Sequence, residues 1–371
     1  MTTDLPRLAI HVFGAGKGES IVLRLPDGRW GVVDCFAGSS ADPATNPVLR
    51  FLESQKVTEL EFLCLTHPHD DHFKGMSHLL EACSVRYFWL FNGLSGKHFL
   101  QLVQLLDVEV AAIHQEDQIE NAREFAKIFS LVNQKKRCQQ PPLMEKRPGP
   151  GTPLYPVPLD RSAHFQIIGL APSGNQVSRY DRGLQSCFDS QGNVRGRLPQ
   201  SHHNIVSVAL LVVYGDTRII LGGDLEKAGW RDVIAEVGAA NLAANVVKIS
   251  HHGSPNGYCD QLWELFSANG KPVGVVTAYV PKLPSRTALD HIAQHTNKLL
   301  TTCLTALEEH QLPTGVDPDV FRSRLALMRK MGPLSDHRRH QCGQCTLIFD
   351  DQGHCIETEL VPPAGELLPV S

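Results

Sequence analysis

The chain has 371 residues, 42% of them hydrophobic, and a formal net charge of −4. Such a length is enough to bury a large core in one big domain or two smaller ones. The mild acidity means that any surface for a polyanion must be local. No apolar stretch of about 18 residues occurs, so no membrane span is expected.

The first residues, Met1 to Arg7, contain no apolar core of a secretion signal. Ten cysteines are scattered along the chain, mostly within apolar runs, as Cys64 and Cys83 are. A disulfide framework is not expected in a chain of this size. We therefore expect a protein of the reducing cytoplasm.

The beginning of the chain predicts strands joined by a glycine-rich connection. Leu8 to Phe13 has a strand pattern, and three glycines lie within residues 14–20. Residues 21–25 and 30–34 are the next predicted strands, with the turn Pro26-Asp27-Gly28 between them. A phosphate-binding glycine loop is the weaker alternative, because strands rather than a helix follow the glycines.

A dense group of potential metal ligands follows the next predicted strand, Leu60 to Leu65. Neutral imidazole and carboxylate bind zinc, manganese or iron, and side chains at a strand exit can converge on one point. A solvated polar loop is the less favoured alternative, because so dense a cluster has few other uses. The spacing suits two ions, with one pair of ligands for each: His67 and His69, then Asp71 and His72.

The run His67-Pro68-His69-Asp70-Asp71-His72 resembles the signature of the metallo-β-lactamase superfamily. Those proteins are metal-dependent hydrolases, so the resemblance implies an α/β fold of the αββα sandwich type, here with a helical insertion and a C-terminal extension. Gly16 to Ser20, Pro26-Asp27-Gly28 and Asp34 narrow the resemblance to the β-lactamase-like domain of competence-type (ComEC-type) DNA-uptake proteins. The glycine-rich turn departs from that branch's pattern at two positions.

Further matches to the motifs of the superfamily extend the set of site residues. Asp34 matches an aspartate that orients a ligand from behind, with a plain turn residue as the alternative. Asp224, in Gly222-Gly223-Asp224, matches a carboxylate that bridges two cations. His203 lies four residues before Ser207, as a ligand histidine does, whereas Asn204 fits the asparagine of the competence-type branch. Both readings stay open.

The fifth motif lies at the exit of the predicted strand 245–249, in the run Ser250-His251-His252-Gly253-Ser254. We expect His251 to be the ligand, as the first histidine out of the strand. His252 could then hold a substrate phosphate or the leaving group, and Ser254 contact the substrate. The inverse assignment of the two histidines is the alternative.

The resemblance implies two divalent ions, with zinc as the first expectation and manganese as the alternative. The expected ligands are His67, His69 and His203 for one ion, Asp71, His72 and His251 for the other, and Asp224 as the bridge. Asp71 and Asp70 are candidates to orient the attacking hydroxide between the ions. Asp34 and Asn204 are expected to lie behind the ligands.

Residues 1–280 are expected to form the hydrolase core, with an insertion at about residues 95–160. Within the insertion, residues 97–107 and 116–132 predict helices. Residues 281–371 are expected to pack on the core as a helical segment, including a helix over 286–311, and a closing β-hairpin. Cys342 and Cys345 have the spacing of a structural zinc site, but a hairpin with incidental cysteines is favoured.

Residues 175–201 are polar and predict a flexible arm beside the site. Its arginines could guide a polyanion, although an ordinary exposed loop fits equally well. They are Arg179, Arg182, Arg195 and Arg197.

The first functional hypothesis is a metal-dependent DNA nuclease, because the competence-type resemblance implies a DNA phosphodiester as substrate. A second hypothesis is a hydrolase of a small phosphodiester, a phosphorylcholine ester or a cyclic nucleotide. A third is an effector or sensor subunit of a larger assembly, such as a bacterial defence system, in which a protein partner holds the nuclease idle.

Overall fold

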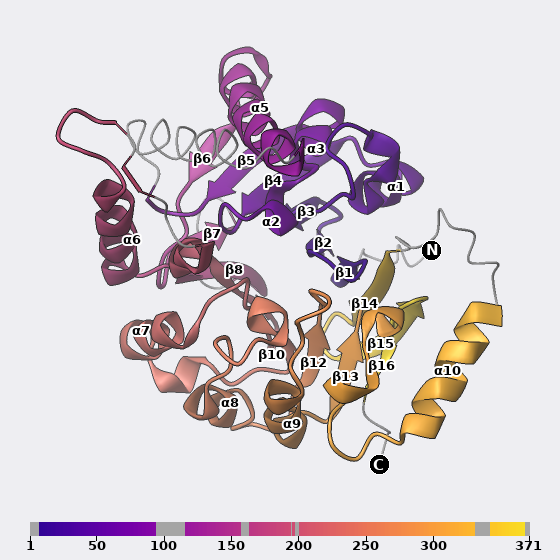
Figure 1. Cartoon of the computed structure of the whole chain (residues 1–371). Coiled ribbons are helices and arrows are strands. Elements are labelled where there is room, and N and C mark those ends of the chain that lie inside the picture. The colour runs from indigo at the N-terminus through magenta and orange to yellow at the C-terminus, as the bar shows by residue number, and fades with distance from the viewer. Residues whose placement is uncertain are drawn as a thin grey trace.

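The computed structural model describes residues 7–93, 116–156, 163–193, 195–196, 200–330 and 342–367. Its strands form two eight-stranded sheets that lie in the middle of the molecule, with helices on the outer side of each (Figure 1). The predicted αββα sandwich is confirmed. No helix within these ranges is long and apolar enough to cross a membrane.

The first sheet is antiparallel at one end and parallel from β3 to β6. Its strands in spatial order are β15 (Cys355–Val361), β14 (Gly343–Phe349), β1 (Ala9–Gly14), β2 (Ser20–Arg24), β3 (Trp30–Val33), β4 (Glu59–Leu65), β5 (Ser84–Leu90) and β6 (Met144–Lys146). The N-terminal hairpin and the C-terminal hairpin therefore lie side by side, with Ile10 opposite both Leu23 and Leu347.

The second sheet is parallel from β10 to β13 and antiparallel at both ends. Its strands in spatial order are β16 (Gly365–Glu366), β13 (Lys298–Thr301), β12 (Val273–Val276), β11 (Val246–Lys248), β10 (Thr217–Leu221), β9 (Ala209–Tyr214), β8 (Phe165–Ala171) and β7 (Pro153–Tyr155). Its central strands are rich in apolar residues, as expected where both faces of a sheet are buried. Along β9, Leu210 and Val212 join the core shared with the first sheet, whereas Ala209 and Leu211 join the core beneath the outer helices.

Helices α1 (Pro47–Ser54), α3 (Met76–Ala82) and α5 (Glu116–Cys138) cover the first sheet, and α7 (Lys227–Val237), α8 (Asp260–Phe266) and α9 (Arg286–His295) cover the second (Figure 1). Helix α10 (Pro318–Lys330) packs through Phe321 on the core of the second layer. Helix α1 begins where it does because the Asn46 side chain accepts hydrogen bonds from the Val48 and Leu49 N–H groups. The helix predicted over 116–132 is confirmed as α5, and the one over 97–107 lies outside the described residues.

The C-terminal part differs from the expected helical segment. The helix predicted over 286–311 is wrong beyond His295, because residues 298–301 form β13 in the buried row of parallel strands. The expected boundary at residue 280 therefore falls between two neighbouring strands of one sheet, β12 and β13. The closing hairpin is present as β14 and β15, and within the described residues Cys342 and Cys345 belong to no group of metal ligands.

The predicted polar arm begins as helix α6 (Gly174–Ser186), so the arm prediction is wrong for these residues. Ser173 Oγ accepts a hydrogen bond from the Gln176 N–H, and the Gln176 side chain accepts one from the Ser173 N–H. This capping box starts a helix whose inner face buries Tyr180 and Leu184. The two capping residues were the sequence signal for it.

His11 in β1 predicts a pH-dependent stability. Burial, together with the charge of Arg24, lowers the pKa of His11 from 6.5 to about 4. As the pH falls, His11 therefore takes up a proton in the unfolded chain before it does so in the folded one. The contribution of His11 to the unfolding free energy is fully present above the ordinary pKa of 6.5 and is lost as the pH drops toward 4. We expect a loss of about 2 kcal/mol in unfolding free energy between about pH 7 and about pH 5. Urea unfolding at both pH values should show a much smaller loss for His11→Gln, and an unchanged loss would contradict the assignment.

Candidate metal centre

Potential metal ligands lie where strands of both sheets end. β3 and β4 run parallel, and Asp34 and the run Thr66–His72 follow them directly. β10 and β11 are also parallel, and Asp224 and the run Ser250–Gly253 lie just beyond their ends. The carboxyl ends of parallel strands meet at one edge of a sheet, and here the loops from the two sheets meet each other.

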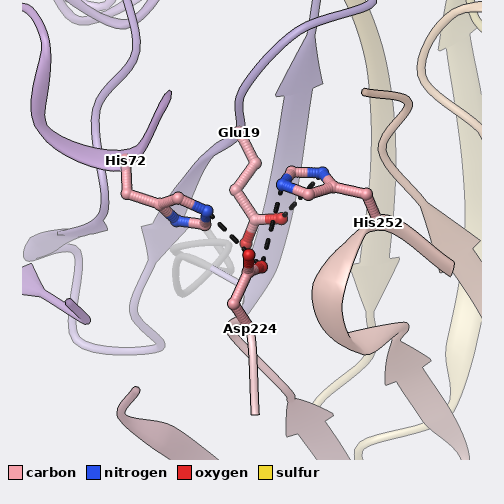
Figure 2. Close-up of side chains that lie close together, drawn as sticks. All are labelled: Glu19, His72, Asp224 and His252. Atoms are coloured by element: carbon pink, nitrogen blue, oxygen red, sulfur yellow. Dashed lines mark ion pairs between the residues drawn. The ribbon is translucent and has the colours of Figure 1, made fainter. Parts of the chain in front are cut away.

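The ligand atoms form two overlapping groups. His67, His69 and Asp224 each offer an atom within 4.8 Å of the other two. The second group comprises Glu19, His72, Asp224 and His252, whose side chains converge from separate segments of the chain (Figure 2). Every member except the half-buried His69 is buried, so the groups lie below the surface.

Asp224 belongs to both groups because its two oxygens face different histidines. Its Oδ2 lies 3.8 Å from Nε2 of His67, and its Oδ1 lies 3.4 Å from Nε2 of His72. Ser207 fixes the approach of this loop, since its Oγ accepts a hydrogen bond from the Asp224 N–H. The geometry is that of a carboxylate shared between two cation positions.

The second group contains two buried atoms that face each other at 3.4 Å as an ion pair but lack a hydrogen bond. Neither Nε2 of His72 nor Oδ1 of Asp224 makes a hydrogen bond to any described residue. Such atoms are costly to bury without a partner. Imidazole nitrogen and carboxylate oxygen, facing each other in a buried cluster, fit the preferences of zinc or manganese.

Asp34 orients one histidine of each group. It accepts hydrogen bonds from Nδ1–H of His72 at 2.7 Å and from the Thr66 hydroxyl at 2.6 Å. The Thr66 oxygen in turn accepts from Nδ1–H of His67 at 3.0 Å. Both imidazoles are therefore held in the tautomer that leaves Nε2 free for a cation. Asp34 thus contacts His72 directly and His67 through Thr66, and its role as the residue that orients metal ligands stays a prediction.

A second relay, which the sequence analysis missed, stands behind His252. Nδ1 of His252 lies 2.9 Å from the Thr277 hydroxyl, which donates to Glu19 Oε2 at 3.0 Å. Lys248 Nζ donates to the same oxygen at 2.5 Å, and both charged side chains are 1% exposed. His252 thereby presents Nε2 to Asp71 Oδ2 at 3.0 Å. The available signal was a lysine inside an otherwise apolar strand, which requires an acidic partner.

The structure places the two histidines of the fifth motif opposite to the expectation. His252 is buried in the second group, whereas His251 is partly exposed, with Nε2 3.3 Å from Asn204 Nδ2 and 3.9 Å from Asp224 Oδ2. Both histidines have left-handed backbone, with φ of 48° and 51°. The expectation assumed an extended exit from the strand, and two left-handed residues turn the second side chain inward instead. Ser254 lies at the next turn, where its Oγ accepts from the Asn256 N–H.

His203 lies beside the first group but is not one of the side chains whose ligand atoms all lie within 4.8 Å of one another. Its ring centre is 5.4 Å from that of His69, and its Nδ1 is 3.1 Å from the Tyr180 hydroxyl. Burial holds the pKa of His203 well below its usual range, so the imidazole is neutral. Asn204 lies behind His251 and donates to Glu226 Oε1 at 3.2 Å.

The two neighbouring aspartates occupy different environments. Burial raises the pKa of Asp71, but His72 and His252 lower it more, and the carboxylate stays ionised. Asp70 is more exposed and accepts from Lys17 Nζ at 3.0 Å. Both line a cavity of about 280 Å³ above the ligands, here called the mouth, together with Asn204, His251, Tyr279 and Lys282.

The expected arginines lie away from the mouth. Arg179 and Arg182 are exposed on α6, and Arg195 pairs with Asp189 at 3.5 Å. Arg197 lies outside the described residues. None of the three described arginines lines the mouth.

Comparison with known proteins gives similarity of fold only. No family model and no curated protein matches the sequence. Similar solved structures include a mutant of the CmlA β-hydroxylase (14% identity, TM-score 0.33, 66% of this chain), of which this chain spans only 35%. A diphosphatase of the PhnP family is 9% identical, with a TM-score of 0.36, and the match covers 76% of this chain and 91% of that one. The Rm3 metallo-β-lactamase is 10% identical, with a TM-score of 0.33, and the match covers 79% of this chain and 92% of that one. The closer resemblance to competence-type proteins stays a prediction.

Paired alanine variants separate the two histidines of the fifth motif. We expect His252→Ala to lower the metal content by about one ion per chain, because it removes a buried ligand nitrogen. His251→Ala should leave the metal content near that of the wild type. Elemental analysis of both purified variants tests this, and the reverse pattern would restore His251 as the ligand.

Proposed function

We propose that the protein is a hydrolase of phosphodiesters that depends on two divalent ions, zinc in the first place and manganese as the alternative, and that its substrate is DNA. One observation carries the proposal: two groups of potential ligand atoms, all buried except His69, share Asp224. A pair of divalent ions in such a site lowers the pKa of a water and neutralises charge on phosphoryl oxygens.

The proposed ligand set keeps the residues expected from the sequence except at the fifth motif. His252 takes the place expected for His251, and Glu19 acts behind it through Thr277. The ligands are His67, His69 and His203 for one ion, Asp71, His72 and His252 for the other, and Asp224 for both. His203 is included because its ring lies beside His69 and its imidazole is neutral.

The remaining polar groups at the mouth would position the substrate. Asp71 is ionised and lines the mouth, where it can accept a hydrogen bond from a water and so orient it. His251 is 18% exposed at its side chain and is suited to contact a substrate phosphate or the leaving group. Asp70 is held by Lys17 at the rim.

Two features support a polyanionic substrate. Lys282 at the mouth and Lys17 beside it bring positive charge next to the ligands. Arg179 and Arg182 extend from α6, the helix whose Tyr180 contacts His203. A chain of phosphates bound at the mouth would meet Lys282 there, and Arg179 and Arg182 could contact it only farther along its length, away from the mouth. A protein partner and a role as effector or sensor subunit stay predictions.

The experiment compares plasmid, single-stranded DNA, RNA and bis(4-nitrophenyl) phosphate, each with zinc or manganese and at several salt concentrations. We expect metal-dependent cleavage of DNA that weakens as salt rises, and none by Asp71→Asn. Rapid turnover of the small ester with DNA untouched would instead identify a small-phosphodiester hydrolase. If the protein hydrolyses none of the four substrates, the proposal is rejected.

A further inference from the structure

A second and larger cavity, of about 660 Å³, adjoins the mouth. Its volume lies in the range typical of small-molecule sites, about 300–1,000 Å³. Asp70 lines both cavities, and Glu19, a member of the second ligand group, also lines the larger one. A substrate held at the metal centre would therefore have this cavity directly beside its reacting group.

Lys17 stands at the junction of the two cavities. Its Nζ lies 3.0 Å from Asp70 Oδ2, 6.0 Å from the ring centre of Phe36 and 5.9 Å from that of Tyr279. Phe36 lines the larger cavity and Tyr279 lines the mouth. Burial lowers the pKa of Lys17, but Asp70 raises it more, so the ammonium stays charged and its ion pair with Asp70 stands at the passage between the cavities.

The lining of the larger cavity combines aromatic rings with positive charge. Phe13 and Phe36 supply the rings, and Phe36 is only partly buried. Lys74 is already neutralised by Glu120 at 2.7 Å. Arg50, exposed on α1, forms no ion pair with any residue that the structure describes, so its guanidinium is free for an anionic ligand.

We infer that the larger cavity binds the nucleotide next to the scissile phosphodiester of single-stranded DNA. The base would lie against Phe36, and the following phosphate would pair with Arg50. A base can reach an aromatic side chain only when it is unpaired, which selects single strands over duplex. The guanidinium matches a phosphate in charge and planar geometry. This inference rests on the proposed function and names its substrate.

The test uses a short single-stranded DNA and bis(4-nitrophenyl) phosphate, which is too small to need the larger cavity. Arg50→Ala should raise KM for the DNA about tenfold and flatten its salt dependence, with kcat and turnover of the small ester unchanged. Phe36→Leu, which keeps an apolar side chain, should raise the same KM about tenfold through lost stacking.

Arg137→Ala is the matched control. Arg137 is an exposed arginine at the C-terminal end of α5. This end of α5 lies beside the start of β5, because Lys135 contacts the carbonyl of Cys83 just before that strand. The start of β5 is at the opposite end of the parallel strands from the site. We expect it to leave both reactions unchanged.

The inference is overturned if Arg50→Ala and Phe36→Leu leave KM for the DNA unchanged, or if they impair both substrates equally. An RNA of the same length serves as a third substrate, and an effect of the variants on KM for the RNA alone would also overturn the inference. If the wild type cleaves neither substrate, the proposed function fails by itself. Fluorescence anisotropy of the labelled intact DNA with added zinc then tests the cavity alone, and the same two variants should weaken binding about tenfold.

Discussion

Asp224→Ala is expected to remove both metal ions and to lower phosphodiester hydrolysis by more than about a thousandfold. Asp224 is the one residue that belongs to both ligand groups, with Oδ2 toward His67 and Oδ1 toward His72. Its removal leaves two histidines in the first group and takes the carboxylate from beside His72. Elemental analysis and turnover of bis(4-nitrophenyl) phosphate measure the two effects together.

Asp216→Ala is the matched control, because Asp216 is an exposed aspartate at the opposite end of β10. It should keep full metal content and activity. Circular dichroism of Asp224→Ala should show intact secondary structure. Retention of both ions by Asp224→Ala would show that Asp224 is no ligand, and loss of a single ion would confine it to one group.

The second large effect concerns the ion pair of Glu19 and Lys248. Glu19→Gln is expected to lower the unfolding free energy of the chelated protein by about 3–5 kcal/mol, because it leaves a buried ammonium without its counter-charge. Lys248→Met should destabilise similarly by leaving the carboxylate unpaired. The double variant should recover much of the loss, since neither charge remains in the interior.

Glu81→Gln provides the comparison for this pair. Glu81 pairs with Lys127 at 2.8 Å, but both side chains are more than 40% exposed, at 44% and 43%. Its loss should cost less than about 1 kcal/mol. Urea unfolding of all four variants measures the differences. A cost for Glu19→Gln as small as that for Glu81→Gln would contradict a buried, mutually dependent pair.

Local patterns predicted the parts of the site that depend on one strand and its exit. The apolar run before Thr66 and the glycines before Asp224 place these loops at strand ends, and the structure brings His67, His69, His72 and Asp224 together there. The αββα sandwich was expected from the resemblance carried by the run His67 to His72, and the two sheets of the structure agree with it.

Features that depend on backbone reversal or on distant partners were not predictable in this way. Which of His251 and His252 points into the ligand group depends on the left-handed backbone of both residues. Histidine at these positions does not indicate such a backbone. Glu19 and Lys248 are 229 residues apart in sequence and meet only because the two sheets stack. Their complementary charges become informative only once the fold is known.

The errors in secondary structure have similarly local causes. Residues 298–301 form a strand because they extend a row of parallel strands, which a four-residue apolar segment cannot announce. The polar composition of residues 175–201 suggested an arm, although Ser173 and Gln176 form a capping box and Tyr180 and Leu184 lie one turn apart on the buried face of α6.

The metal content of protein purified without chelator tests the central claim most directly. The account predicts about two zinc or manganese ions per chain, together with hydrolysis that chelation abolishes and added metal restores. A folded protein that contains no metal and binds neither zinc nor manganese on titration would contradict it.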